Sequence, residues 1–213
     1  GRMPHGEALS SEIPEKDAYM LRKPKGVVAI ISPWNFPLAI GAFWCAAPAL
    51  VEGNTVVLKP SEDAPLSTEL AVKAYEEAGI PAGVINLVHG DGNTGDFLAR
   101  DDVDHICFTG SAEVGQHIRR VCANSWHKTC SCEMGSKSAV IVFDDANLEL
   151  AVSSSIASAF KLSGQRCVSA GRLIVHRSVY DEFSDLFTLH AQQIKVGDVH
   201  DTNNYMGPLI NRE

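Results

Sequence analysis

The stretch GVVAIIS at residues 26–32 is the feature that most constrains the fold. Its residues are apolar without alternation and of strand length, which is the pattern of a parallel strand covered on both faces. Two prolines, Pro33 and Pro37, follow directly, break regular pairing and leave Trp34 and Asn35 on a loop. Open α/β sheets bind ligands outside the carboxyl ends of their strands, so we expect this loop to border a binding site.

Strand-like and helix-like stretches alternate along the rest of the chain. Further strands are predicted at residues 55–58, 84–88, 105–109, 129–133, 139–143 and 171–176, and helices up to 53–54 and at 67–78, 96–100, 111–123, 148–160 and 179–194. Residues 1–25 indicate at most one edge strand, residues 89–95 a glycine-rich loop, and the residues after 194 a loop. This alternation with short links is typical of an α/β fold with a doubly wound parallel sheet, in which right-handed crossovers gather the loops at one edge.

Charge and hydropathy exclude several classes of partner. The chain has 26 acidic and 18 basic residues, a formal charge of −8, and no basic run, so neither nucleic acid nor an anionic membrane is an expected partner. The longest apolar run, residues 36–51, is shorter than a bilayer span and contains Pro37 and Pro48. Without a signal peptide pattern, we expect a soluble protein of the reducing cytoplasm.

The cysteines are spread through the chain without the spacing of a metal site. They are Cys45, Cys107, Cys122, Cys130, Cys132 and Cys167. Neither a paired CxxC nor a following HxxxH occurs, which argues against both zinc and a disulfide framework. Cys130 and Cys132 lie two apart in an expected strand, roughly 6.6 Å along it, and we interpret them as small core residues. No metal is expected, and the scattered histidines receive no role.

Three residues are candidates for catalysis. Cys167 lies in the polar turn SGQRCVS at residues 163–169, where the neighbouring Arg166 can favour a nucleophilic thiolate; the alternative is an ordinary core cysteine. Asn35 offers an amide donor for an oxyanion. Glu133, at a strand end before a glycine turn, is either a general base whose pKa burial raises or a carboxylate at a helix N-terminus.

Two further groups of residues suit a dinucleotide. Gly110, Ser111 and Gly115 lie at a strand-to-helix turn, where free N–H groups and the helix dipole attract a pyrophosphate. They do not form a GxGxxG fingerprint, so a simple tight turn is the alternative. Lys59 and Glu62 follow a strand end and can bind ribose hydroxyls, or they are solvated loop charges.

Five motifs occur in an order that is diagnostic when they are taken together. They are PWNFP at 33–37, KPSE at 59–62, FTGS at 108–111 with Gly115, EMGSK at 133–137 and GQRC at 164–167. In these motifs the chain resembles the NAD(P)-dependent aldehyde dehydrogenase superfamily. The resemblance implies a Rossmann-like cofactor domain followed by the start of a second α/β catalytic domain. It also implies an internal fragment: residues 1–134 are an NAD-binding domain without its N-terminal part, and residues 135–213 a truncated catalytic domain.

The resemblance implies a chemical role for each catalytic candidate. Cys167 attacks the aldehyde carbonyl to give a thiohemiacetal, whose oxyanion the Asn35 amide and the Cys167 backbone N–H stabilise. Glu133 activates the water that hydrolyses the resulting thioester to a carboxylic acid. The sequence departs from the family at Met134, where leucine is usual, and at Ser136, where a second glycine is usual, so the turn after Glu133 is expected to be stiffer.

The resemblance also implies the cofactor contacts. The candidates are Ser32, Trp34, Lys59, Ser61, Glu62, Gly92, Gly110, Ser111 and Gly115. Trp34 and Ser111 resemble pyrophosphate contacts, and Lys59 and Glu62 resemble contacts to the adenine ribose. Because a carboxylate at Glu62 repels a 2′-phosphate, NAD is expected over NADP.

The substrate and two competing functions stay open. The partner is a small aldehyde, the parent enzyme is expected to be a homo-oligomer, and Arg166 with Lys161 suggests a carboxylate-bearing semialdehyde. One alternative is a non-catalytic fragment or relative that keeps the fold and the NAD site. The other is a cofactor-free cysteine hydrolase, against which the dinucleotide motifs argue.

Overall fold

The computed structural model describes residues 6–212. The chain divides into two compact units, one formed by residues 1–109 and 113–132 and the other by residues 110–112 and 133–213. Each unit has an apolar cluster of its own, around Ile30 and Leu58 in the first and around Val152 and Phe183 in the second.

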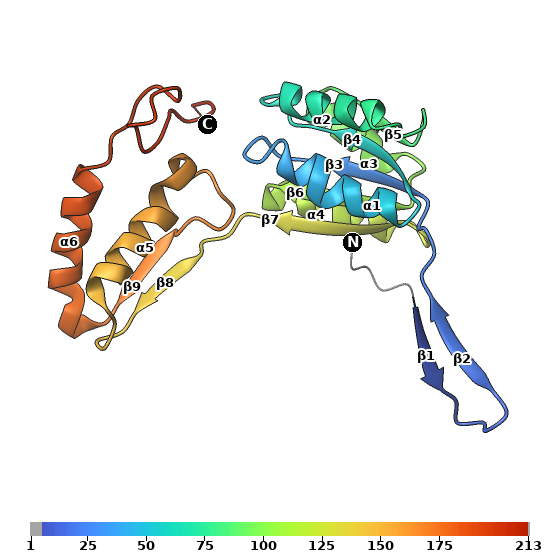
Figure 1. Ribbon diagram of the computed structural model, residues 1–213, viewed down its shortest axis with the longest axis horizontal. Coiled ribbons are helices and arrows are strands. Elements are labelled where there is room, and N and C mark those ends of the chain that lie inside the picture. Colours follow the sequence, from blue (N-terminus) through green and yellow to red (C-terminus); the bar gives the residue numbers. More distant parts are fainter. Residues whose placement is uncertain (1–5, 213) are drawn as a thin grey trace. The chain divides into compact units, whose positions relative to one another are not determined.

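A five-stranded sheet forms the centre of the first unit (Figure 1). Its order is β5-β4-β3-β6-β7, with β3 at Val27–Ile31, β4 at Thr55–Lys59, β5 at Ile85–Leu87, β6 at His105–Gly110 and β7 at Thr129–Met134. The pairs β3–β4, β4–β5 and β3–β6 are parallel. The chain winds outward from β3 to β5 and then returns to the other side of β3, so the predicted doubly wound sheet is confirmed. The winding reverses between β3 and β6, where such sheets bind their ligands.

The apolar run at residues 26–32 becomes the central strand β3 for the reason that its sequence indicated. Val28, Ala29 and Ile30 are buried in succession, so neither face of the strand meets water. In register with them, Val28 lies opposite Val56 and Ile30 opposite Leu58, and both partners are fully buried. A strand covered on both faces has no position for a polar side chain, which explains the missing alternation.

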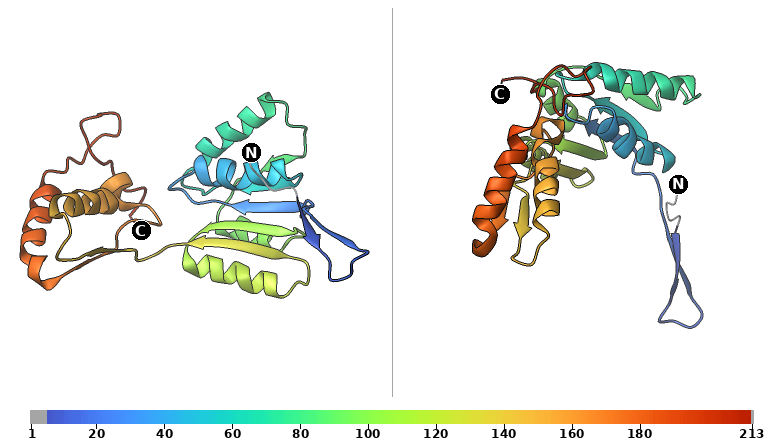
Figure 2. Two further views of the ribbon diagram at one scale, coloured as in Figure 1. Left: turned by 60° about the horizontal axis from the view of Figure 1, so that its bottom comes forward. Right: turned by 60° about the vertical axis from the view of Figure 1, so that its left-hand side comes forward.

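Helices cover both faces of this sheet. The π-helical η1 (Ala39–Ala46) continues into α1 (Ala47–Val51), and with α2 (Pro65–Glu77) it connects the strands on one side of β3. The helices α3 (Gly92–Arg100) and α4 (Ala112–Ala123) lead into β6 and β7. Figure 2 shows α1 and α2 on one side of the sheet and α4 on the other, as right-handed crossovers require.

Two sequence predictions in this unit are wrong. The helix α3 begins at Gly92 and not at residue 96, because the Asp91 carboxylate caps it by accepting hydrogen bonds from the backbone N–H groups of Asn93 and Thr94. The N-terminal segment forms a two-stranded antiparallel hairpin, β1 (Gly6–Ser10) with β2 (Asp17–Leu21), where one edge strand was expected.

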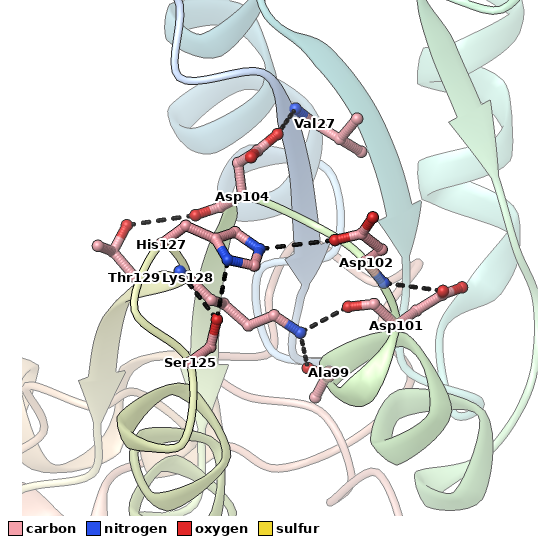
Figure 3. A network of polar contacts seen from close by, with 9 residues as sticks. All are labelled: Val27, Ala99, Asp101, Asp102, Asp104, Ser125, His127, Lys128 and Thr129. Carbon is pink, nitrogen blue, oxygen red and sulfur yellow. Dashed lines mark hydrogen bonds and ion pairs between the residues drawn. The ribbon is translucent and has the colours of Figure 1, made fainter.

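Polar contacts fasten the amino ends of the strands (Figure 3). In Figure 3 the Asp104 carboxylate accepts from the Val27 N–H at 2.8 Å, and the Asp104 carbonyl accepts from the Thr129 hydroxyl at 3.4 Å. The same carbonyl also accepts from the Thr129 N–H at 3.1 Å. Lys128 donates from Nζ to the Ala99 and Asp101 carbonyls at 2.9 and 2.5 Å, at the end of α3. These contacts join the starts of β3, β6 and β7, so the opposite edge is left for the long loops.

The second unit is a small α/β layer. The parallel strands β8 (Ala139–Val142) and β9 (Arg172–Val175) pack against α5 (Leu148–Phe160) and α6 (Tyr180–Gln192), with short 3₁₀ turns η2 (Lys161–Gly164) and η3 (Arg177–Val179) between them. The predicted helices at 148–160 and 179–194 are confirmed, the first with its limits unchanged. None of the helices within residues 6–212 combines the length and the apolar character that crossing a bilayer demands.

Candidate functional site

The loop after β3 packs against the helices of the first unit. The Ile40 N–H donates to the Phe36 carbonyl at 3.0 Å, and the Thr68 hydroxyl donates to the Pro37 carbonyl at 2.7 Å. The Phe36 ring lies 6.1 Å from the ring of Trp44 in η1. These contacts hold residues 33–37 against η1 and α2, so the half-buried Trp34 and Asn35 come from a fixed backbone.

Ser32 contributes to this loop mainly through its backbone. Its N–H donates to the Lys59 carbonyl at 3.1 Å, and the residue is only 4% exposed. A Cβ added to Gly41 would lie 2.8 Å from the Ser32 Oγ, so the hydroxyl lies against η1. The Ser32 hydroxyl is therefore enclosed between β3 and η1, and the role of Ser32 as a cofactor contact stays a prediction.

Lys59 is a buried cation at the carboxyl end of β4. The residue is 3% exposed, and its Nζ donates to the Pro60 and Gly90 carbonyls at 2.8 and 2.6 Å. Glu62, with a side chain 55% exposed, pairs with the same Nζ at 3.8 Å. Burial lowers the pKa of Lys59, and the carboxylates of Glu62 and Asp91 oppose that shift. The solvated-charge alternative is therefore wrong for Lys59, whereas Glu62 does face water.

A cavity of about 330 Å³ opens at Pro60 and Gly90, whose carbonyls accept from this lysine, although Lys59 itself does not line it. Its walls combine apolar and polar groups from the loop after β4, the first turns of α2 and the loop after β5: Pro60, Ser61, Glu62, Pro65, Leu66, Glu69, His89 and Gly90. The Ser61 hydroxyl accepts from the Asp63 N–H at 3.3 Å, and His89 pairs with Glu69 at 3.7 Å. Apolar walls with a few polar groups suit the nucleoside half of a dinucleotide. Ser61 and Glu62 belong to the KPSE motif, whereas Glu69 and His89 reach the cavity through packing that no motif marks.

The candidate glycines lie at helix starts. Gly92 is the first residue of α3, and space is open where a side chain would stand. Gly110 ends β6, the exposed Ser111 follows it, and α4 begins at the next residue, as predicted. Gly115 is buried one turn later, and its carbonyl accepts a long hydrogen bond from the Cys132 thiol at 3.8 Å. Gly115 therefore allows close packing of α4 on β7.

Glu133 occupies the position before the end of β7 and is exposed. The helix N-terminus alternative is therefore wrong, because the residue lies in a strand, and the described residues do not bury it; its role as a general base stays a prediction. Glu133 lies on the exposed face of β7, and its neighbours Cys132 and Met134 lie on the opposite, half-buried face. The described residues thus leave the Glu133 carboxylate in contact with water.

Cys167 is the exposed cysteine of the six, all of which are free thiols. The other five are buried or half-buried. Burial is the main reason why the pKa of the Cys122 thiol is raised to about 11. Cys45 and Cys107 contact each other through a thiol hydrogen bond that raises the pKa of Cys107 and lowers that of Cys45. The core-residue alternative is therefore wrong for Cys167, which is exposed, whereas Cys130 and Cys132, interpreted as small core residues, are half-buried.

The backbone before Cys167 adopts an unusual conformation. Leu162, Ser163 and Gly164 have φ angles of 57°, 59° and 72°, which place three successive residues in the left-handed region. This conformation costs roughly 1–2 kcal/mol for a residue that has a Cβ. The Ser163 hydroxyl donates to the Gly207 carbonyl at 2.8 Å, and the Gln165 side-chain oxygen accepts from the Ile210 N–H at 2.9 Å. Residues 207–210 thus hold the loop in its strained form.

Arg166 is attached to the end of α5 by one of its guanidinium nitrogens. Its Nη2 donates to the carbonyls of Ala157 and Ser158, both at 2.9 Å, in the last turn of α5. Lys161 is exposed at the end of the same helix. The semialdehyde preference suggested from Arg166 and Lys161 stays a prediction.

Comparison with known proteins places this geometry in a family. The sequence model of the aldehyde dehydrogenase family matches residues 1–213. Betaine aldehyde dehydrogenase of Bacillus subtilis is 44% identical over 210 residues, which are 98% of this chain and 42% of that protein. A probable NADP-dependent succinate-semialdehyde dehydrogenase of Sinorhizobium fredii is 42% identical over 214 residues, 98% of this chain and 43% of that protein.

A solved structure agrees with the sequence relatives. Betaine aldehyde dehydrogenase of Staphylococcus aureus, in complex with NAD+, superposes with a TM-score of 0.92 at 38% identity, covering 98% of this chain and 41% of that chain. The chain thus spans about two fifths of the length of the relatives it matches. With a family model matched along its whole length, the chain belongs to the aldehyde dehydrogenase family.

Proposed function

We propose that the chain is part of an NAD-dependent aldehyde dehydrogenase that oxidises an aldehyde to a carboxylic acid. Residues 1–134 supply the NAD-binding domain and residues 135–213 the beginning of the catalytic domain. The observation that most supports this proposal is the buried Lys59 beside a cavity of about 330 Å³ that Ser61 and Glu62 line. A lysine held by backbone carbonyls next to such a cavity is suited to bind hydroxyl groups, which a cofactor-free hydrolase does not need.

The residues at the carboxyl ends of β3, β4 and β6 are suited to a dinucleotide. Lys59 and Glu62 bind the hydroxyls of the adenine ribose, a donor and an acceptor side by side at 3.8 Å. Trp34 and the turn at Gly110 and Ser111 contact the pyrophosphate, with the backbone of Ser32 and the start of α3 at Gly92 adding to the same edge. When bound, NAD accepts the hydride that the aldehyde carbon loses.

The chain's own residues perform the acyl chemistry. The Cys167 thiolate attacks the aldehyde carbonyl, and the oxygen of the resulting thiohemiacetal accepts hydrogen bonds from the Asn35 amide and the Cys167 N–H. Loss of the hydride leaves a thioester on Cys167. Glu133 takes a proton from water, the hydroxide adds to the thioester, and the carbon–sulfur bond breaks to release the acid and the thiol.

The cavity favours NAD over NADP. Glu62 and Glu69 place two carboxylates on its walls, and both repel a 2′-phosphate. A probable NADP-dependent enzyme is among the relatives, so the preference for NAD is proposed from the residues of this chain and not from the family. The affinities for the two cofactors, measured by calorimetry, test it, and tighter binding of NADP would sink it.

Aldehyde-dependent formation of reduced nicotinamide tests the whole proposal. The wild-type chain, Cys167→Ala and the matched control Cys130→Ala are compared by absorbance. Turnover in the wild type and the control, and none in Cys167→Ala, is the expected result. Turnover that survives in Cys167→Ala contradicts the nucleophile assignment.

A second function has one specific observation in its favour. Because the chain spans about two fifths of its relatives, it can be a fragment that keeps the fold and the NAD site without turnover. NAD binding without aldehyde-dependent reduction by any of the three proteins would favour it. Homo-oligomerisation of the parent enzyme and a cytoplasmic location stay predictions.

A further inference from the structure

Arg166 connects the cysteine loop to the end of a helix. The last carbonyls of an α-helix have no partners within the helix, and the helix dipole makes that end attractive to a cation. The cationic Arg166 side chain lies at this end of α5, where its Nη2 donates at 2.9 Å to the Ala157 and Ser158 carbonyls. Charge-assisted hydrogen bonds of this kind are the stronger ones.

The same two carbonyls also receive both ends of the loop. The Lys161 N–H, where the loop leaves the helix, donates to the Ala157 carbonyl. The Ala170 N–H, where the loop returns, donates to the Ser158 carbonyl at 3.4 Å. Arg166 therefore adds the middle point of attachment to a loop that folds back on the end of α5.

Cys167 sits in a turn that Arg166 begins. The Ser169 N–H donates to the Arg166 carbonyl at 3.1 Å, so residues 166–169 form a hydrogen-bonded turn with Cys167 second. The left-handed residues Leu162 and Ser163 precede it, and such a backbone persists only where surrounding contacts hold it. One arginine thus fixes this turn by its side chain and closes it by its backbone.

We propose that Arg166 is a positioning residue, which fixes the turn at residues 166–169 on the end of α5 and thereby orients the Cys167 thiol. It does not bind an anionic group of the substrate. The catalytic role of Cys167 rests on the proposed function. The attachment of the turn by Arg166 does not depend on that function.

The first experiment measures hydrogen exchange in the chain itself. Arg166→Met keeps the length of the side chain and removes its donors and charge, and Arg166→Lys keeps the charge. We expect the amides of Ser169 and Ala170 to exchange about tenfold faster in Arg166→Met and to recover part of their protection in Arg166→Lys. Arg172→Met is the matched control, because Arg172 donates from Nε and Nη2 to the Lys137 carbonyl at 3.2 and 3.0 Å, outside the turn.

The second experiment compares two thiol reagents. Iodoacetamide is neutral and iodoacetate is an anion of similar size, and mass spectrometry follows their rates at Cys167. A positioning role changes both rates by one factor in Arg166→Met, with rescue in Arg166→Lys. A role in binding anions lowers the iodoacetate rate selectively.

Three results would overturn the proposal. They are unchanged exchange and unchanged reactivity in Arg166→Met, a selective loss of the iodoacetate rate, and an equal effect of Arg172→Met. If Arg166→Met does not fold, as judged by circular dichroism, Arg166→Gln replaces it in the same comparison. Neither readout uses NAD or aldehyde, so failure of the proposed function leaves this test intact.

Discussion

Asn54 is the polar residue whose removal should damage the first unit most. It is 8% exposed, and its Oδ1 accepts from the N–H groups of Lys25 and Gly26 at 2.6 and 2.9 Å. Its Nδ2 donates to the Ala49 carbonyl at 2.9 Å. One side chain therefore connects the start of β3, the end of α1 and the start of β4.

The cost of Asn54→Ala follows from these three hydrogen bonds. A net contribution of about 1 kcal/mol for each gives a loss of about 3 kcal/mol in the free energy of unfolding. The half-buried N–H groups of Lys25 and Gly26 are left without their acceptor, which makes this figure a lower estimate. Asn54→Asp keeps both acceptor bonds but buries a carboxylate and sets one of its oxygens against the Ala49 carbonyl, so a loss of about 2 kcal/mol or more is expected.

Urea unfolding followed by tryptophan fluorescence measures this loss. Trp34, Trp44 and Trp126 all lie in the first unit, so the signal reports that unit. Asn86→Ala is the matched control: Asn86 also donates from Nδ2 to two carbonyls but is exposed, so water replaces its bonds and a cost below about 1 kcal/mol is expected. Equal costs for the two variants would refute the reasoning.

Three further perturbations test other parts of the fold. Gly41→Ala should cost about 1–3 kcal/mol in urea unfolding, because its Cβ would lie 2.8 Å from a buried hydroxyl, while Gly92→Ala, with open space around it, should be neutral. Burial, and to a smaller extent the charge of Lys25, lowers the pKa of His105, so the folded state binds fewer protons than the unfolded state and stability falls as the pH drops below about 6.5. In His105→Gln the melting temperature should depend less on pH in this range. An unchanged slope of melting temperature against pH contradicts this prediction. Leu162→Gly should stabilise the second unit by about 1 kcal/mol in thermal melts followed by circular dichroism, because it relieves a φ of 57°, and a loss of stability argues against strain there.

Elements whose sequence fully states their environment were predictable. The strand β3 lacks polar positions because both of its faces are covered, and α5 begins where the Asn147 side chain accepts from the Leu150 N–H at 3.0 Å. The loop around Cys167 was equally marked, since glycine and polar residues separate α5 from β9 there. In each case the local signal and the tertiary structure agree.

The start of α3 could not be read from its residues. Gly92 and Gly95 indicate a loop by composition, yet both lie in the helix. A Cβ on Gly95 would meet the Lys59 side chain at 3.4 Å, which is ordinary van der Waals contact, so this glycine lies within reach of β4 in a regular helix. The cap at Asp91, and not the composition of the segment, sets the start of α3.

The charged site residues illustrate the same limit most clearly. From their positions in the sequence, Lys59 and Glu133 are expected to be similarly exposed to solvent, since each lies at the end of a strand before a loop. The fold buries the lysine, because the Gly90 carbonyl, 31 residues away, approaches its Nζ to 2.6 Å, and it leaves the glutamate exposed. Burial depends on which loops the sheet order brings together, and β4 lies beside β5 while β7 lies at the edge of the sheet. Charge can therefore be read from one residue, whereas its desolvation, and with it the direction of a pKa shift, requires the neighbouring strand.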